Sequence, residues 1–309
     1  MTTKRILIVD DLHPIFKEEA AQLGYICDEQ PLITRGQTLK IISDYAGLVI
    51  RTKFFIDKEI IDAAPNLKFI ARAGAGMDNI DEKYALSKGI TCINAPEGNR
   101  DAVAEHAMGM LLSLMNNLRK GDQQIRNGVW DREGNRGWGL AGKTVGIIGY
   151  GNTGQSFALK LSGFDVEVLA FDKYKTGYSD EFVRENSMEQ IVKYVDVLSL
   201  HVPLTRETRN LINDEYLFHF KKPIFLLNTS RGEIVETQAV LNSLESGKIL
   251  GAGLDVLEVE KFPSLSNATW FNNLIQNEKI LLTPHVAGWT FESYKKISEV
   301  LASKLKTLV

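Results

Sequence analysis

The sequence predicts an α/β protein built from two doubly wound parallel sheets. Short apolar runs of strand length alternate with segments of helical spacing, and the connections between them are short. The alternation occurs twice, over about the first hundred residues and again from Lys143 on. Repeated βα units form parallel sheets with helices on both faces. A length of 309 residues is also enough for two domains, each with its own core.

The first series predicts four strands with a helix near each. Lys4–Asp10 is a continuous apolar run, as expected of a strand that is covered on both faces. Further strands are expected at Leu48–Arg51, Leu67–Ala73 and Ile90–Ala95. Helices are expected at 14–23, 37–44, 57–64 and 81–88.

A long helix is predicted over residues 101–119. Its apolar residues surround most of the helix instead of forming one stripe, so the helix should be buried. A contact between subunits and an interface within the chain are the two settings we expect for it. Residues 127–141, rich in Gly, Asn and Arg, predict a long loop.

The second series predicts six strands and a closing helix. Strands are expected at 144–149, 166–171, 195–200, 224–228, 250–254 and 279–282. Helices are expected at 152–163, 187–193, 209–219 and 236–247. From Phe291 on, apolar residues recur at spacings of three and four, which indicates one amphipathic helix. This helix follows the second series, so it is expected to pack back onto the first domain.

Composition excludes several classes of function. A net charge of −3 offers no basic surface for nucleic acid. The longest uncharged apolar stretch, near Ala107–Met115, is half the length of a membrane span. The first ten residues lack the apolar core of a signal peptide. Cys27 and Cys92 lie in apolar, strand-like runs, so we expect buried thiols and a cytoplasmic location.

A dinucleotide site is predicted at Gly149–Gly154, whose sequence GYGNTG matches G-x-G-x-x-G. The segment follows an apolar strand and opens a helix, and Asn152 and Thr153 begin that helix. The glycines would make a tight turn, admit a pyrophosphate and let helix and strand pack closely, while the helix N-terminus faces the phosphates. A purely structural turn is the alternative. Asp172 ends the next strand and favours NAD over NADP, whereas Lys173 beside it argues the other way.

Catalytic candidates follow three strands of the second series. Arg231, in the segment NTSRG, is placed for bidentate capture of a carboxylate. His285 follows the strand at 279–282 and can serve as acid or base near pH 7, and Glu260 would orient its imidazole. Taken singly, each also has a structural reading, as a turn arginine, a core histidine and a solvated loop charge. No ligand spacing for zinc is present, so no metal is expected.

In the first domain, Ala73–Gly76 is a turn of small residues that follows a strand. Its free backbone N–H groups would form an anion-binding concavity, suited to a substrate carboxylate; a plain tight turn is the alternative. Arg51 ends another strand, and Arg100 is expected in a turn before the long helix. Either arginine could reach a second anionic group or remain a solvated charge.

Seven segments together resemble the D-isomer-specific 2-hydroxyacid dehydrogenases over nearly the whole chain, with the strongest likeness to phosphoglycerate dehydrogenases. The segments are ARAGAGMDNID (71–81), NAPEGNRDAVAEHAMGMLL (94–112), GKTVGIIGYGNTG (142–154), LHVPLTRETRNLIN (200–213), NTSRGEIV (228–235), GLDVLEVE (253–260) and LLTPHVAGWT (281–290). The resemblance implies a flavodoxin-like substrate domain, 1–99 and 287–309, and an inserted Rossmann NAD-binding domain, 100–286. It also implies a homodimer through the NAD-binding domain.

The resemblance implies a role for each matching residue. Arg231, Glu260 and His285 would be the catalytic trio. The residues expected to bind NAD are Gly149, Gly151, Asn152, Thr153, Gly154, Asp172, His201, Pro203, Thr205, Thr229, Ser230, Asp255, His285 and Gly288. The residues expected to bind the substrate are Arg51, Ala75, Gly76, Asn99 and Arg100.

Two departures from the family pattern are visible. The family usually has proline directly after the position of Glu260, where this chain has Lys261, and Pro263 follows two residues later. Only 24 residues follow His285, so we do not expect the serine-binding regulatory domain that many phosphoglycerate dehydrogenases carry. Three functions remain open: oxidation of 3-phospho-D-glycerate, reduction of hydroxypyruvate or glyoxylate, and NAD sensing by a corepressor-type binding protein.

Overall fold

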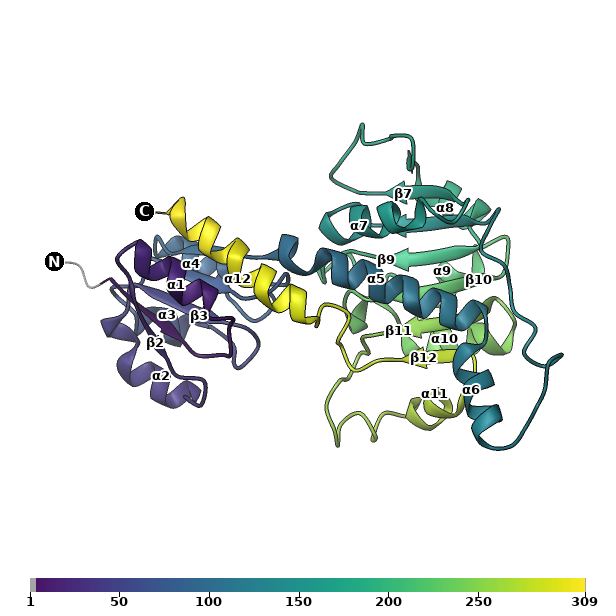
Figure 1. Ribbon diagram of the computed structural model, residues 1–309, viewed down its shortest axis with the longest axis horizontal. Coiled ribbons are helices and arrows are strands. Elements are labelled where there is room, and N and C mark those ends of the chain that lie inside the picture. The colour runs from purple at the N-terminus through teal and green to yellow at the C-terminus, as the bar shows by residue number, and fades with distance from the viewer. Residues whose placement is uncertain (1–3, 309) are drawn as a thin grey trace. The chain divides into compact units, whose positions relative to one another are not determined.

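The computed structural model describes residues 4–308, which form two compact units. One unit runs up to Arg100 and resumes at Trp289, and the other is Asp101–Gly288. Each unit is a parallel sheet covered by helices (Figure 1) and has a hydrophobic core on either face of the sheet. The predicted α/β class with two doubly wound parallel sheets is therefore confirmed.

The first unit has a five-stranded sheet in the order β2-β1-β3-β4-β5. Its strands are β1 (Arg5–Ile8), β2 (Ile26–Glu29), β3 (Gly47–Ile50), β4 (Phe69–Arg72) and β5 (Thr91–Asn94). Its helices are α1 (Ile15–Gln22), α2 (Arg35–Ile41), α3 (Lys58–Asp62), α4 (Glu82–Ser87) and α12 (Phe291–Lys306). This is the flavodoxin-type strand order, in which the chain changes direction across the sheet between β1 and β3.

The last helix, α12, belongs to the first unit although it follows the second. It packs against α1 and β5 (Figure 1). Its apolar side chains share a core with Ile6, Ile8 and Phe69. Thr290 caps the helix, since its hydroxyl accepts a hydrogen bond from the N–H of Ser293. The amphipathic spacing from Ile297 to Leu305 is thus accounted for by one buried face, whereas Phe291 at the start of the helix is 94% exposed.

Strand β2 was not among the predicted strands. It is the edge strand of the sheet and pairs with β1 alone. An edge strand need not be apolar on both faces, and Ile26 at its start is 64% exposed. The segment Ile-Cys-Asp-Glu therefore lacks the continuous apolar pattern by which the central strands were recognised.

The second unit has a seven-stranded sheet in the order β12-β11-β10-β9-β6-β7-β8. The strands are β6 (Thr144–Ile148), β7 (Glu167–Phe171), β8 (Arg184–Glu185), β9 (Val197–Leu200), β10 (Ile224–Asn228), β11 (Ile249–Leu254) and β12 (Ile280–Leu282). The helices are α5 (Pro96–Met115, begun in the first unit), α6 (Leu118–Arg126), α7 (Asn152–Leu161), α8 (Met188–Tyr194), α9 (Asp214–Phe218), α10 (Thr237–Glu245) and α11 (Phe271–Gln276). This is the Rossmann order, and its direction change lies between β6 and β9.

The region predicted as one helix over 101–119 is two helices. Helix α5 begins at Pro96, so Asn99 and Arg100 lie in its first turns, and the prediction of a turn at Arg100 was wrong. Asn117 in the left-handed conformation, with φ of 52°, separates α5 from α6. The apolar residues of α5 pack on the sheet of the second unit, which favours an interface within the chain as the reason for its apolar surface.

The cysteines and the short elements also differ from expectation. Cys27 and Cys92 are free and only partly buried, because β2 and β5, on which they lie, are the two edge strands of their sheet. Burial nevertheless raises the pKa of each thiol to about 11. The short elements β8 and α11 were not predicted.

Among residues 4–308, no helix has the length and apolar character needed to cross a bilayer.

Candidate active site

The glycine loop after β6 has the geometry of a dinucleotide-binding turn. Gly149 has φ of 94°, which side chains rarely allow, and a Cβ there would lie 2.3 Å from the carbonyl oxygen of His201. A Cβ on Gly154 would lie 2.1 Å from the carbonyl oxygen of Gly149, whereas one on Gly151 would meet nothing within 4 Å. The first and third glycines therefore allow close packing, and the second leaves the backbone open to a ligand.

Helix α7 presents its N-terminus at this loop. No side chain caps the helix at Gly151, and the first N–H groups of the helix, from Asn152 and Thr153 on, have no partner within the helix. These amide groups and the positive end of the helix dipole favour a phosphate. The open backbone and the uncapped helix together fit the pyrophosphate of a dinucleotide.

Asp172 closes the turn after β7. Its Oδ2 accepts a hydrogen bond from the N–H of Tyr150 at 2.9 Å, and its Oδ1 accepts from the N–H groups of Tyr174 at 2.9 Å and Lys175 at 3.1 Å. A carboxylate accepts about four hydrogen bonds, so three are used within the protein. Asp172 is thus held by backbone groups at the carboxyl end of β7, with capacity for about one ribose hydroxyl donor.

Two buried polar atoms just after β9 and β10 have no partner among the described residues, namely Nδ1 of His201 and Oγ1 of Thr229. His201 follows β9 and Thr229 follows β10, the strands next along the sheet from β6. Nε2 of His201 is hydrogen-bonded to Oγ of Ser199 at 2.9 Å. Burial lowers the pKa of His201 to about 3, so the imidazole is neutral at physiological pH. These unpaired atoms fit polar contacts to a bound dinucleotide.

The loop after β9 is fixed by its own threonines. The Thr208 hydroxyl donates to the carbonyl of Pro203 at 2.7 Å and accepts from the N–H of Thr205 at 2.8 Å. The Thr205 hydroxyl accepts from the N–H groups of Glu207 and Thr208, each at 3.2 Å. Pro203 and Thr205, both expected at the cofactor, therefore lie in a turn with a defined backbone.

His285 and Glu260 form the central pair of the site. Nδ1 of His285 lies 2.9 Å from Oε2 of Glu260, although 25 residues separate them. The two side chains are 47% and 39% exposed, so Nε2 on the other side of the ring has access to a ligand. The pair forms in spite of Lys261, which replaces the proline of the family pattern. A carboxylate on Nδ1 fixes the tautomer and the orientation of the imidazole.

The backbone of His285 is held in the left-handed region, with φ of 57°. This conformation costs a non-glycine residue about 1 kcal/mol or more. The His285 N–H donates to the carbonyl oxygen of Asp255 at 2.8 Å. The Asp255 carboxylate, which is 2% exposed, accepts from the N–H groups of Val286 and Ala287, each at 2.9 Å. Asp255 therefore organises the loop that carries the histidine.

His106 on α5 extends this network and was not identified as a functional residue. The Thr283 hydroxyl donates to Oδ1 of Asp255 at 2.6 Å. Nε2 of His106 lies 3.0 Å from the same hydroxyl, and since the Thr283 proton is already used, His106 is the donor. The signal in the sequence was weak, because 177 residues separate His106 from Thr283.

Arg231 follows β10 in a turn held by Asn228. The Asn228 amide donates to the carbonyl of Arg231 at 2.9 Å, and its Oδ1 accepts from the N–H and the hydroxyl of Ser230. A guanidinium nitrogen of Arg231 donates to the Ser230 carbonyl at 2.7 Å. A Cβ on Gly232 would lie 1.9 Å from the carbonyl oxygen of Leu257, so the turn packs against the segment that leads to Glu260. Gly288, also expected at the cofactor, is the last residue of this unit.

The candidate substrate residues of the first unit lie after β3 and β4 and at the start of α5. Within residues 4–308, the N–H groups of Ala75 and Gly76 donate no hydrogen bond to protein, which suits an anion. The Arg51 guanidinium lies 4.4 Å from the centre of the Trp289 ring. Oδ1 of Asn99 is buried without a partner among the described residues.

Comparisons with known proteins agree with this geometry. The profile of a family described as "D-isomer specific 2-hydroxyacid dehydrogenase, NAD binding domain" matches residues 108–287. A hydroxypyruvate reductase of Thermotoga maritima is 35% identical over 275 residues, which cover 88% of each chain. A D-3-phosphoglycerate dehydrogenase of Methanocaldococcus jannaschii is 32% identical over 308 residues, which cover 99% of this chain and 57% of the relative.

A solved structure supports the same assignment. D-lactate dehydrogenase from Aquifex aeolicus, complexed with NAD and lactic acid, has a TM-score of 0.81 and 27% identity, covering 98% of this chain and 94% of that one. The expected resemblance is confirmed, and the dinucleotide that the glycine loop fits is NAD. The chain belongs to the D-isomer-specific 2-hydroxyacid dehydrogenase family and is an NAD-dependent enzyme of that family.

Proposed function

We propose that the enzyme oxidises 3-phospho-D-glycerate to 3-phosphohydroxypyruvate. The observation that carries the reaction is the pair of His285 and Glu260, with Nδ1 and Oε2 2.9 Å apart. Nε2 of His285 would take the proton from the C2 hydroxyl, and the Glu260 carboxylate would stabilise the resulting imidazolium. When bound, NAD would supply the hydride acceptor, and the C2–H and O–H bonds would break as the carbonyl forms. In the reverse direction His285 would return the proton.

Arg231 would stabilise charge on the reacting oxygen and contact the substrate carboxylate. In the first unit, Ala75 and Gly76 would bind that carboxylate through their N–H groups, with Asn99 beside them. On the cofactor side, the glycine loop and Asn152 and Thr153 would bind the pyrophosphate. The remaining proposed contacts to NAD are Asp172 at the ribose, His201, Pro203 and Thr205 along the adenosine, and Thr229, Ser230, Asp255 and Gly288 toward the nicotinamide.

The phosphate of the substrate would be bound by arginine. Within residues 4–308, Arg51 makes no ion pair with an acidic side chain, and its guanidinium rests on the Trp289 ring. Arg100 is the second proposed contact. The Lys53 ammonium donates to the carbonyl of Pro31 instead. An arginine that is charged and free of carboxylate partners in this region supports a substrate with a second anionic group.

A panel of substrates tests this assignment. The rate of NAD reduction or NADH oxidation, followed by absorbance, would be compared for 3-phosphoglycerate, D-glycerate, D-lactate, hydroxypyruvate and glyoxylate. The proposal expects kcat/KM for 3-phosphoglycerate to exceed that for D-glycerate by about a hundredfold, the value of one or two charge-assisted contacts. Equal kcat/KM for 3-phosphoglycerate and D-glycerate would refute the phosphorylated substrate. Arg51→Met should remove the difference in kcat/KM between these two acids, while the enzyme still turns over D-glycerate through His285.

Reduction of hydroxypyruvate or glyoxylate is the second candidate. It is favoured by the match to the hydroxypyruvate reductase of T. maritima, which covers 88% of both chains. In this case the 2-oxo acids of the panel would be turned over fastest, and Arg51→Met would have little effect on them. Absence of turnover with every acid of the panel, despite NADH binding, would refute both substrate assignments.

A homodimer through the NAD-binding domain is proposed as the assembly. Its support is a set of exposed apolar side chains on α6 and the loop after it, namely Leu118, Ile125, Val129, Trp130 and Trp138. Large exposed apolar side chains that gather in one region mark interaction surfaces. Light scattering should give the mass of two chains for the native protein, and Trp130→Ser should shift it toward one.

A further inference from the structure

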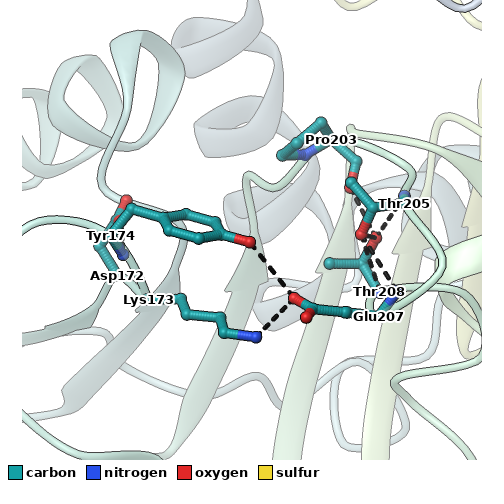
Figure 2. Close-up of polar contacts among 7 residues, drawn as sticks. All are labelled: Asp172, Lys173, Tyr174, Pro203, Thr205, Glu207 and Thr208. Carbon is teal, nitrogen blue, oxygen red and sulfur yellow. Dashed lines mark hydrogen bonds and ion pairs between the residues drawn. The ribbon is translucent and has the colours of Figure 1, made fainter.

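An ion pair joins the two loops that flank the glycine loop. In the sheet, β6 lies between β7 and β9, so the loops after β7 and β9 stand on either side of the loop that binds the dinucleotide. Nζ of Lys173, after β7, lies 2.6 Å from Oε2 of Glu207, after β9. The Tyr174 hydroxyl donates to the same oxygen at 3.3 Å. Figure 2 shows Lys173 and Tyr174 converging on the Glu207 carboxylate.

The backbone of Glu207 lies in a turn that hydrogen bonds hold together. Its N–H donates to the Thr205 hydroxyl at 3.2 Å, within the turn that Thr208 ties to Pro203 (Figure 2). The ion pair keeps the pKa of Glu207 below its ordinary value and that of Lys173 above its own, so both groups are charged at neutral pH. The turn therefore fixes the position of the Glu207 backbone, and the long Lys173 side chain reaches the Glu207 carboxylate.

The position of Lys173 matters because of its neighbour, Asp172. A dehydrogenase that uses NADP needs a cation near the end of this strand, where the 2′-phosphate of the adenosine ribose lies. Lys173 follows Asp172 directly, and its flexible four-carbon stem could reach such a phosphate. The other ammonium of the turn, that of Lys175, donates to the carbonyl of Tyr150 at 3.1 Å. The chain thus has a cation, Lys173, at the position where NADP requires one, but this cation is paired with Glu207.

We propose that Glu207 is a specificity-determining residue, which excludes NADP by holding Lys173 in an ion pair away from the 2′-phosphate. Asp172 repels the phosphate directly, and Glu207 withholds the nearest ammonium that would compensate for this repulsion. Glu207 acts through Lys173, so the proposal predicts that the effects of changing the two residues are not additive.

The test is a double-mutant cycle on Glu207→Gln and Lys173→Met. Dissociation constants of NADH and NADPH, measured by calorimetry without turnover, would be combined with kcat/KM for NAD and NADP on the best acid of the substrate panel. Glu207→Gln should raise the affinity for NADPH relative to NADH by about tenfold, the size of one charge-assisted contact at a half-exposed site. The gain should shrink in high salt, because the lysine is exposed.

The matched control is Glu167→Gln. Glu167 forms an exposed ion pair with Arg184, 2.7 Å between Oε1 and Nη1, and it lies at the opposite end of β7 from Asp172. Glu167→Gln removes the same charge from the same unit and should leave the ratio of NADPH affinity to NADH affinity unchanged. In the Lys173→Met background, Glu207→Gln should give no gain.

Three results would overturn the proposal. The first is an unchanged ratio in Glu207→Gln. The second is an equal gain with and without Lys173, since Glu207 would then act by its own charge alone. The third is an equal gain in Glu167→Gln, which would reduce the effect to net charge. Thermal unfolding of each variant establishes that the protein is folded before its affinities are compared.

Discussion

Acid is expected to destabilise the NAD-binding unit through His201. The imidazole is 8% exposed at the carboxyl end of β9, and its Nδ1 has no partner among the described residues. Burial lowers its pKa from 6.5 to about 3. His201 therefore binds a proton at a higher pH in the unfolded chain than in the folded protein. Between the two pKa values, this protonation shifts the equilibrium toward the unfolded state.

The size of the effect follows from these two pKa values. Between pH 6.5 and about pH 3 the unfolded state binds more protons than the folded state, so stability falls as the pH falls. Each pH unit in this window costs about 1.4 kcal/mol. From pH 7 to pH 5, His201 alone should remove about 2 kcal/mol, a substantial part of the 5–15 kcal/mol that is typical of folded proteins.

The assay compares the native protein with His201→Asn, which does not titrate and can still hydrogen-bond to Ser199. The free energy of opening would be measured at pH 7 and pH 5 by amide hydrogen exchange in β9, corrected for the intrinsic rate, so that it reports on this unit alone. The variant should be less stable at pH 7 but lose about 2 kcal/mol less on acidification. The exposed His219, changed to Asn, is the control. Equal pH dependence in His201→Asn and the native protein would refute the reasoning.

Three further predictions concern the active site and the glycine loop. His285→Ala should lower kcat by about 10²–10⁴-fold with NADH affinity retained in calorimetry, and near-full turnover would contradict its role. Asp255→Asn replaces a buried acceptor of three hydrogen bonds and should lower kcat. It should also lower the free energy of unfolding, measured by urea titration, by about 2–4 kcal/mol. Gly154→Ala should raise the KM for NAD about tenfold or more, since its Cβ would lie 2.1 Å from the Gly149 carbonyl oxygen, whereas Gly163→Ala, with nothing within 4 Å, should not.

The parts of the fold that could be predicted are those whose signal is local. The strand β6, the glycines after it and the helix α7 follow each other within one short segment, and each constrains the next. The central strands are covered on both faces, so their sequences are continuously apolar. The edge strand β2 and the two-residue β8 lack this constraint, and neither was predicted.

The site depends on contacts that local patterns do not contain. His285 and Glu260 were proposed together because both follow strands of one parallel sheet. Neither the left-handed backbone of His285 nor the link from His106 through Thr283 to Asp255 has a local signature, since these contacts join segments far apart in sequence. Likewise, the ion pair between Lys173 and Glu207 has no local signature, since 34 residues separate the two.

The return of α12 to the first unit has a consequence for the order of folding. The second unit is one continuous stretch of chain, whereas the core of the first lacks Ile297, Leu301, Ala302 and Leu305 until α12 is synthesised, after the whole of the second unit. On the ribosome the usual rule that the N-terminal domain folds first is therefore expected to be reversed. The NAD-binding unit should mature while the first hundred residues wait, and the enzyme should be most vulnerable to proteolysis at its N-terminus during synthesis.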